Sequence, residues 1–510
     1  MPPRLRLAVA GAAALAAPLA LPSLAAPAAA QTTNACVTSV PDAGSTTPQK
    51  ICFSLFKPAG ADRRHRVPMV LHSHGWGGSR TTDATNGGVK PFLDAGYGVL
   101  SFDQRGFGES GGKARIENPE YEGRDVARLV DLVSRLDWVV QDGKGDPRLG
   151  SIGGSYGGGY QFVGAFRQIA DAHKQVFDAM APEITWWDLK QSLAPQGVAK
   201  TEWDSALTAA GAKSLPTEVL QGFAESAATG TWSDGSNGTV DLDGFFAKNG
   251  PKWQVSQGRR IDVPVLFRQG ITDELFPLDQ GLKNFAGALT PQARRHSIFV
   301  GYNGGHVLPN AFPLTVQPSD DPCSAKLSGG KDFTALTVRF FDTWLKHRAD
   351  KLSGYGQYHL ATAGGTCSTT RAVTPSRTVP VPSLATTELV GPPMAVKVAD
   401  GPIRVAGSPV LSGTITALGT NNRAFYALGI GTSPADAKIV QGNMLPWASA
   451  QPVSGTAVRI DLPSVAVDVP AGQSLFVIAA ATNDMYLGFG SRTPGVVLLD
   501  EGKVALPLVR

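Results

Sequence analysis

The sequence has few of the residues that build metal and redox centres. Its 510 residues include only four cysteines without C-x-x-C spacing, and its eight histidines lack the spacing of metal ligands. The first long apolar run is not followed by a G-x-G-x-x-G motif, which is the usual sign of a dinucleotide site. We therefore expect no metal ion and no other cofactor.

Charge is scarce as well. Charged residues make up 17% of the chain, and the formal net charge is +4. Arg4 and Arg6 lie in an expected leader peptide, and removing these two charges from +4 leaves +2. So small a net charge gives no reason to expect binding to nucleic acid. The hydrophobic content of 42% is that of a globular protein, and the length predicts more than one domain.

The first 30 residues have the pattern of a secretory signal peptide. Arg4 and Arg6 precede an Ala- and Leu-rich stretch, and an A-x-A cleavage site occupies residues 28–30. Pro18 and Pro22 interrupt the stretch, so we expect no stable membrane anchor. The sequence thus predicts export to the periplasm or the extracellular space.

The even number of cysteines agrees with export. Cys36, Cys52, Cys323 and Cys367 allow three disulfide pairings. We favour Cys36–Cys52 and Cys323–Cys367, because each pair joins near neighbours in the sequence. The alternative is four unpaired, buried thiols.

Strand and helix patterns alternate from the end of the leader to about residue 350. Two short strands at 36–40 and 51–56 form a predicted hairpin. Continuous apolar runs, typical of strands buried on both faces, occur at 67–72, 98–102, 176–181, 263–268 and 296–300. Helical periodicity is found at 123–139, 160–170 and 332–347. Such alternation predicts an α/β fold with a mostly parallel sheet covered on both faces.

Two segments depart from this alternation. Residues 183–257 are aromatic and helix-prone, which is typical of a lid inserted between two strands. From residue 351 short β-runs separated by Gly and Pro continue to residue 510, which predicts an all-β sandwich. We therefore expect a catalytic α/β domain in two parts, 31–182 and 258–350, the lid between them, and a C-terminal β domain. Most lid aromatics should form its own core, and one or two could line a substrate cleft.

The most informative stretch is Gly153-Gly154-Ser155-Tyr156-Gly157. This G-x-S-x-G pattern lies between a short strand and a helix, which is the context of a nucleophile elbow. The turn is so tight that a Cβ on the glycines beside the serine would strike a neighbouring element. Ser155 is therefore the candidate nucleophile, although an isolated G-x-S-x-G also occurs by chance in loops.

A nucleophilic serine needs a histidine base oriented by a carboxylate. In hydrolases with this elbow the chain order is Ser, then Asp or Glu, then His. Asp273 follows the first predicted strand after the lid, and His306 lies in the glycine-rich loop after the next strand. Loops at one edge of a parallel sheet converge in space. We expect Asp273 to be the acid, with Glu274 and Asp279 as rivals.

The oxyanion hole should combine two backbone N–H groups. We assign them to Tyr156, which follows the serine, and to Trp76, in the glycine-rich loop at 74–78. The alternative for that loop is a turn without a catalytic part. Asp103, Arg105 and Ser110 are interpreted as structural residues that hold the loop after the strand at 98–102.

Three motifs resemble a known family. Residues 103–111, DQRGFGESG, are similar to its D-x-R-G-x-G-x-S-x-G motif, and residues 153–158 followed by Gln161 are similar to its elbow G-x-S-Y-x-G-x-x-Q. The β tail, with Val-Pro-Ala-Gly at 469–472, resembles its C-terminal jelly roll. The family is the Xaa-Pro dipeptidyl-peptidase and cocaine-esterase group of α/β-hydrolases.

This resemblance covers essentially the whole mature chain. It implies an α/β-hydrolase domain with a helical lid and a jelly roll, with Ser155, Asp273 and His306 as the triad of an acyl-enzyme mechanism. The loop at 74–78 departs from the family pattern. Its members often use a tyrosine hydroxyl as second oxyanion donor, whereas here the sequence is His-Gly-Trp-Gly-Gly.

The leading interpretation is a secreted serine hydrolase that cleaves a carboxylic ester or related acyl bond in a small substrate. A second is an Xaa-Pro dipeptidyl-peptidase, which needs an acidic anchor for the substrate amine. Asp188, Glu202 and Asp204 in the lid are candidates for that anchor. The third is a non-catalytic surface protein whose jelly roll binds carbohydrate. The oligomeric state cannot be read from the sequence.

Overall fold

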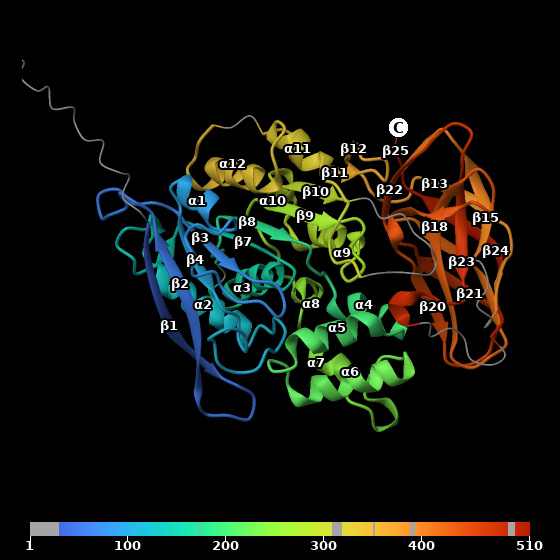
Figure 1. Ribbon diagram of the computed structural model, residues 1–510, viewed down its shortest axis with the longest axis horizontal. Helices are drawn as coiled ribbons and strands as arrows, with labels where there is room; N and C mark the ends of the chain where they lie inside the picture. The colour runs from blue at the N-terminus through green and yellow to red at the C-terminus, as the bar shows by residue number, and fades with distance from the viewer. Residues whose placement is uncertain are drawn as a thin grey trace, which may run out of the picture.

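A long sheet organises the first two thirds of the chain (Figure 1). The computed structural model describes residues 30–172, 174–308, 319–349, 352–387, 393–487 and 495–509. Within these ranges the sheet has ten strands in the order β1-β2-β4-β3-β7-β8-β9-β10-β11-β12. Pairing is parallel from β4 to β11 and antiparallel at both edges. The predicted α/β class is confirmed.

The strands of this sheet are short, as expected for a buried parallel sheet. They are β1 (Gln31–Pro41), β2 (Pro48–Lys57), β3 (Met69–Ser73), β4 (Gly98–Phe102), β7 (Leu149–Gly154), β8 (Ala179–Glu183), β9 (Leu266–Gly270), β10 (Ile298–Tyr302), β11 (Tyr358–Ala361) and β12 (Cys367–Thr370). A separate small hairpin joins β5 (Gln141–Gly143) to β6 (Asp146–Pro147).

Alternate residues of the strands enter two different cores. In β3, Met69 and Leu71 pack with the helices of one face, and Val70 packs with the helices of the other. The first face carries α2 (Glu122–Val133) and α3 (Tyr156–Ala172), whereas the second carries α1 (Lys90–Asp94) and α12 (Phe333–Leu345). Because side chains alternate along a strand, a strand covered on both faces must be apolar throughout. This accounts for the continuous apolar runs.

Further short helices connect the later strands. They are α9 (Leu278–Lys283), the adjoining π-turn η3 (Asn284–Ala288), α10 (Pro291–Arg295) and α11 (Pro322–Ser328). The helix predicted at 123–139 ends earlier, at Val133, because the chain beyond it joins the sheet. Val67 donates its N–H to the Trp138 carbonyl and accepts from the N–H of Val140, so the last apolar residues of the run serve a strand-like bridge.

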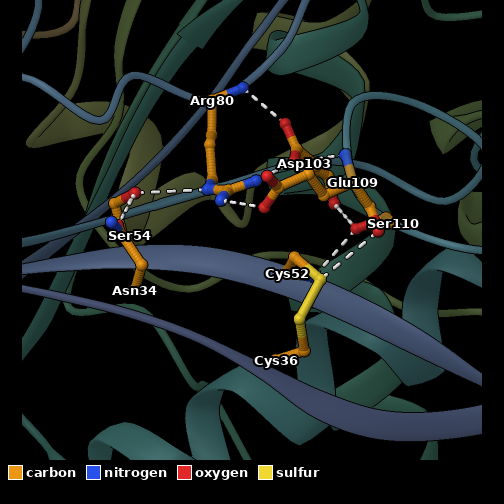
Figure 2. The surroundings of a disulfide bond; sticks show 8 residues. All are labelled: Asn34, Cys36, Cys52, Ser54, Arg80, Asp103, Glu109 and Ser110. Carbon is orange, nitrogen blue, oxygen red and sulfur yellow. Dashed lines mark hydrogen bonds and ion pairs between the residues drawn. A yellow bond between two sulfur atoms is a disulfide. The ribbon is translucent and has the colours of Figure 1, made fainter.

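The first disulfide joins the two strands of the N-terminal hairpin. Cys36 on β1 faces Cys52 on β2 in the antiparallel register, and the two are bonded. Figure 2 shows how the loop after β4 lies against this bond. Ser110 accepts a hydrogen bond from the N–H of Cys52 (2.8 Å) and donates to the Asp103 carbonyl (2.8 Å). Asp103 is paired with Arg80.

Arg105, in the same loop, is held by ion pairs. Its side chain is fully buried and forms a two-point ion pair with Asp125 on α2, with N···O distances of 2.9 and 2.6 Å, while Asp42 binds its other nitrogen at 2.8 Å. A buried guanidinium needs such partners, because an unpaired charge in the interior is costly. Asp103, Arg105 and Ser110 thus anchor the loop after β4, as expected.

The lid segment contains short helices that lie below the sheet in Figure 1. They are α4 (Leu189–Leu193), the turn η1 (Pro195–Gly197), α5 (Thr201–Gly211), α6 (Thr217–Thr229), the turn η2 (Ser236–Gly238), α7 (Leu242–Phe246) and α8 (Pro251–Ser256). Their core includes Trp203, Phe223, Trp232 and Phe246, and it is continuous with Phe476 of the β domain. The lid is therefore packed between the sheet and the C-terminal domain.

Antiparallel sheets make up the C-terminal domain (Figure 1). The strands are β13 (Arg377–Val381), β14 (Leu384–Thr386), β15 (Met394–Asp400), β16 (Ile403–Gly407), β17 (Val410–Ala417), β18 (Asn422–Gly431), β19 (Lys438–Ile439), β20 (Leu445–Ser449), β21 (Val453–Asp461), β22 (Val465–Val469), β23 (Ser474–Ala480), β24 (Val497–Leu506) and β25 (Leu508–Val509). Two 3₁₀ turns, η4 (Val440–Gly442) and η5 (Asp484–Tyr486), interrupt them.

The boundary expected at residue 351 differs from the one observed. Strands β11 and β12 lie beyond that residue but extend the catalytic sheet through β10, and pairing within the β domain begins at β13. The second disulfide, Cys323–Cys367, joins α11 to β12. It therefore lies within the catalytic domain, at the edge of its sheet.

The predicted signal peptide, residues 1–30, lies outside the described residues except for Ala30. Among the described residues, no helix is both long enough and apolar enough to cross a bilayer.

Candidate active site

Ser155 stands at the sharp turn between β7 and α3. Its backbone φ is +58°, a left-handed conformation that is rare for a residue with a side chain. A Cβ on Gly153 would lie 2.6 Å from the Gly157 carbonyl oxygen, and a Cβ on Gly157 would lie 2.5 Å from that of Ser73. Both glycines are thus required by the close approach of backbone. The strain and the missing side chains are those of a nucleophile elbow.

A continuous hydrogen-bonded chain leads away from this serine. Ser155 Oγ lies 2.8 Å from His306 Nε2, and His306 Nδ1 lies 2.7 Å from Asp273 Oδ2. The other carboxylate oxygen of Asp273 accepts the N–H of Phe276 at 2.7 Å. The three sequence-predicted residues are brought together from three separate loops at the carboxyl edge of the sheet, after β7, β9 and β10.

The rival acids face elsewhere. Glu274 Oε2 accepts the N–H of Leu308 at 3.1 Å, and Asp279 pairs with Lys283 at 2.7 Å. The side chain of Asp273 is fully buried, whereas that of His306 is 16% exposed. The arrangement leaves the imidazole edge accessible while the carboxylate is shielded from water, as a base and its orienting acid require.

Aromatic rings hold the imidazole in place. Phe276, three residues after the acid, meets the His306 ring edge-on with centroids 5.2 Å apart. Trp203 from lid helix α5 meets it at 5.9 Å and 90°. The lid therefore contributes directly to the orientation of the histidine.

The glycine-rich loop after β3 runs beside the serine. A Cβ on Gly75 would lie 3.7 Å from that of Ser155. The Trp76 indole N–H donates to the Leu207 carbonyl of α5 at 2.9 Å, and its ring packs edge-on against Tyr156 at 5.0 Å. Tyr156 is the first residue of α3, where helix N–H groups lack partners within the helix. The predicted oxyanion donors thus lie on backbone next to Ser155.

A buried lysine holds the loop that carries Asp273. Lys200, at the start of α5, is 1% exposed, and its Nζ donates to the carbonyl of Glu274 and to that of Leu275, the latter at 3.2 Å. Burial lowers the pKa of Lys200 to about 8, partly opposed by nearby carboxylates including Asp273. The carbonyl contacts offset only part of the cost of burying this ammonium group, because its pKa remains lowered.

Lys200 predicts an unusual dependence of stability on pH. Its pKa is about 8 in the folded protein and 10.5 in the reference state. Between these values the unfolded chain binds more protons, so stability rises with pH. Relative to Lys200→Met, the wild type should gain about 3 kcal/mol of unfolding free energy from pH 8 to 10.5. Urea unfolding of both proteins across this range measures the effect.

The exposed Lys144 offers a matched control for that experiment. Lys144→Met should show no comparable change relative to the wild type, because the charge of an exposed lysine is solvated in both states. If the unfolding free energies of the wild type and of Lys200→Met changed with pH in parallel, the burial argument would be contradicted.

An apolar pocket opens beside the serine. Its cavity volume is about 40 Å³. The residues that line it with Ser155 come from the loop after β3, the start of α3, the lid and the acid loop; they are Trp76, Ile116, Tyr156, Trp186, Leu189, Leu193, Leu207, Phe223, Phe246, Leu275 and Phe276. Three lid-segment aromatics, Trp186, Phe223 and Phe246, thus line the cleft, rather than one or two. No charged side chain belongs to this lining set of described residues.

Within the described ranges, no group of three or more His, Cys, Asp or Glu side chains is placed to share a metal ion.

Comparison with protein families identifies the chain. Residues 49–307, about half of the sequence, match the model of the X-Pro dipeptidyl-peptidase (S15 family). The chain belongs to this family of serine hydrolases. The matched region begins in the N-terminal hairpin and ends directly after His306, so it contains the elbow, the lid and both loops described above. The family suspected from the sequence is confirmed.

Among curated proteins, two Escherichia coli sequences match, each called an uncharacterized 31.7 kDa protein in the traX-finO intergenic region. They are 29% identical over 98 residues and 28% over 95 residues, and each alignment covers 19% of this chain. The matches span only 32% and 31% of the relatives' own length.

Solved structures match over nearly the whole chain. An α-amino acid ester hydrolase aligns with a TM-score of 0.65 at 14% identity, covering 96% of this chain and 99% of that one. A CocE/NonD family hydrolase from Staphylococcus aureus aligns at 0.62 and 12%, covering 93% and 97%. An aminopeptidase from a marine sediment Thaumarchaeota archaeon aligns at 0.60 and 14%, covering 96% and 97%. At such identities the likeness shows the fold alone.

Some residues of the site carry no signal in the sequence. Lys200 lies between alanine and threonine, outside any motif, and its contact with the acid loop spans 74 residues. Asn443 of the β domain donates to the carbonyl of Asp273 across 170 residues. Both contacts depend on how separate segments pack, which no local pattern encodes.

Proposed function

We propose that this protein cleaves a carboxylic ester or related acyl bond through an acyl-enzyme, with Ser155 as nucleophile. The observation that carries the proposal is the hydrogen-bonded chain from Ser155 through His306 to Asp273, with links of 2.8 and 2.7 Å. A serine on a strained elbow beside a buried His–Asp pair has the geometry of an activated nucleophile.

The proposed reaction proceeds in two halves. In the first, Ser155 Oγ attacks the carbonyl carbon as His306 Nε2 takes its proton, and the imidazolium then gives the proton to the leaving alcohol. Asp273 keeps the proton of His306 on Nδ1, so that Nε2 is free to accept. In the second half, water attacks the acyl-enzyme with the same base, and the acid product leaves Ser155.

We assign the oxyanion hole to the backbone N–H groups of Trp76 and Tyr156. Tyr156 opens α3, a helix of 17 residues whose N-terminus favours negative charge. The loop carrying Trp76 is fixed by the indole bond to Leu207 and by ring packing on Phe107 at 4.8 Å. Donors held rigidly in this way need no rearrangement when the oxyanion forms. The side chain of Trp76 has no hydroxyl group, so we assign the donation to its backbone N–H and not to a side-chain hydroxyl such as that of a tyrosine.

The pocket supports a neutral, apolar acyl group as the substrate portion next to Ser155. Its lining is aliphatic and aromatic apart from the serine, and a charged substrate group would be desolvated there without a partner. This favours an esterase over the Xaa-Pro dipeptidyl-peptidase, the second candidate, because that enzyme must bind a free ammonium group.

None of the three acids considered for an amine anchor lines this pocket. Asp188 caps α4 and pairs with Lys252 at 2.6 Å. Asp204 is fully buried on α5, and burial raises its pKa well above the usual range. Burial likewise raises the pKa of Glu202. Burial makes the charged form of both carboxyl groups less favourable, so neither is a strong partner for an ammonium group, which again favours the ester substrate.

Export is part of the proposal. The disulfides Cys36–Cys52 and Cys323–Cys367 support a compartment in which thiols are oxidised. The leader pattern at residues 1–30 points the same way.

A substrate panel tests the assignment. We expect the mature protein to hydrolyse p-nitrophenyl esters of apolar acids and to cleave Gly-Pro-p-nitroanilide at least about 10²-fold more slowly, because an unpaired ammonium in the pocket costs several kcal/mol. Initial rates under identical conditions measure both. Faster cleavage of the dipeptide anilide would establish the exopeptidase instead.

A fluorophosphonate probe separates the enzymes from the third candidate, a carbohydrate-binding surface protein. Covalent labelling that heat denaturation abolishes is expected of the hydrolase. A folded protein that neither labels nor turns over any member of the panel would support the binding function.

A further inference from the structure

One short segment of the β domain reaches into the catalytic domain. It consists of the 3₁₀ turn η4 and the following Asn443, between β19 and β20. The side chains of Gln441 and Asn443 are 1% and 4% exposed, although both are polar amides. A buried amide is costly unless its hydrogen bonds are made, so the partners of these two side chains reveal what the segment holds.

Asn443 contacts the acid loop. Its Nδ2 donates to the main-chain carbonyl of Asp273 at 2.9 Å. The acid is thereby held from two sides, because Lys200 of the lid binds the next two carbonyls of the same loop. The carboxylate of Asp273 makes its own bonds to His306 and to the Phe276 N–H. The hydrogen bond from Asn443 thus fixes the position of the Asp273 backbone.

Gln441 contacts the histidine loop. Its Nε2 donates to Asn303 Oδ1 at 2.9 Å and to the Ala361 carbonyl at 3.2 Å, while its Oε1 accepts the N–H of Ala466 at 2.9 Å. Asn303 lies three residues before His306, and its side chain also donates to the Thr362 carbonyl at 2.9 Å. Every atom of the Gln441 amide group that can bond is therefore used.

The backbone of this segment is strained at the same residue. Gln441 has a φ of +53°, a conformation that residues with side chains rarely adopt. Strain of this kind persists only where the surroundings over-determine it, and it is concentrated at functional sites. Here the strained turn aims one amide at each of the two loops that carry His306 and Asp273.

We infer that Gln441 and Asn443 are positioning residues for the reaction. Through these two side chains the β domain holds the loops that carry His306 and Asp273. This inference rests on the proposed roles of Asp273 and His306. The two amides touch no substrate atom; they fix the loops whose separation sets the His–Asp and Ser–His distances. A misplacement of about 1 Å at such a distance costs about 100-fold in rate.

Asn443→Leu is the decisive variant, because leucine has the shape of asparagine but cannot donate. With a p-nitrophenyl ester of an apolar acid we expect kcat to fall about 10- to 100-fold while KM changes little. The control is Gln451→Leu, which removes an exposed amide elsewhere in the β domain and should leave both constants unchanged. Gln441→Met should lower kcat in the same way through the histidine loop.

A double-mutant cycle separates positioning from general stabilisation. If Asn443 acts through the acid, its removal should have little further effect in an Asp273→Asn background. An equal loss of kcat in both backgrounds would overturn the inference and leave Asn443 a structural residue. Should Asn443→Leu fail to fold, judged by thermal unfolding, Asn443→Ala, which removes the same donor without adding bulk, replaces it in the same cycle.

The outcomes distinguish this inference from the proposed function. Wild-type kcat in Asn443→Leu, together with inactive Ser155→Ala and Asp273→Asn, would overturn the positioning role and leave the triad intact. Retained activity in Ser155→Ala or Asp273→Asn would overturn both, because there would be no triad to position.

Discussion

Ser155→Ala should abolish hydrolysis, with kcat falling about 10⁵- to 10⁶-fold. The serine oxygen is the atom that we expect to attack the acyl carbon, and no neighbouring hydroxyl replaces it at 2.8 Å from His306 Nε2 among the contacts of the described residues. Fluorophosphonate labelling should vanish with it. Rates with the best p-nitrophenyl ester and gel-based probe labelling measure the two effects.

The same variant should remain folded. Alanine and serine both carry a Cβ, so the strain at φ +58° is equal in the two proteins. Among the described residues, the contact of Ser155 Oγ is the one with His306, and it makes no hydrogen bond to backbone that would be lost. The melting temperature should change by no more than a few degrees. Ser134→Ala, at the end of α2, is the matched control and should label normally. Labelling that persists in Ser155→Ala and maps to another serine would refute the assignment.

Much of the catalytic domain could be predicted because its information is local. The apolar runs at 67–72 and 98–102 indicate buried strands, since each residue of such a strand meets a helix on one face or the other. The elbow is equally local: Gly153 and Gly157 are needed where backbone atoms approach within 2.6 Å of a missing Cβ. Chain order then located Asp273 and His306, because parallel strands present their loops at one edge.

The sequence-based predictions fail where a local residue pattern does not specify which other segment it pairs with. Strands β11 and β12 have the same short β-pattern as the strands of the sandwich. Only the pairing of β11 with β10, and of β12 with β11, places them in the catalytic sheet. For the same reason the sequence predicts the bonding partner of Cys367 but places this residue in the β domain, whereas it lies on β12 of the catalytic sheet. Leu136 and Val139 keep the spacing of α2, yet the chain has already left the helix to pair beside β3.

Contacts between domains cannot be predicted from local sequence patterns. Lys200, Gln441 and Asn443 are ordinary polar residues in their local context, and they acquire meaning only when the lid and the β domain pack against the two catalytic loops. The size of the pocket belongs to the same class, because it is set by lid helices and by the acid loop together.

The second large effect is expected of Asp273→Asn, which should lower kcat about 10⁴-fold. The carboxylate accepts from His306 Nδ1 at 2.7 Å and from the Phe276 N–H. An amide of the same shape fills the space but can present its NH₂ group to Nδ1, which favours the histidine tautomer with its proton on Nε2. That tautomer cannot accept the serine proton, and the buried amide cannot stabilise the imidazolium. Initial rates at saturating ester measure the loss.

Glu274→Gln provides the comparison that decides which acid orients the histidine. The two residues are adjacent and both buried, so a general effect of losing a buried charge should appear in both variants. Only Asp273, however, contacts the imidazole, while Glu274 binds the Leu308 N–H. We therefore expect Glu274→Gln to lower kcat far less than Asp273→Asn. Near-normal activity in Asp273→Asn with a large loss in Glu274→Gln would mean that the acid lies one residue further along the chain.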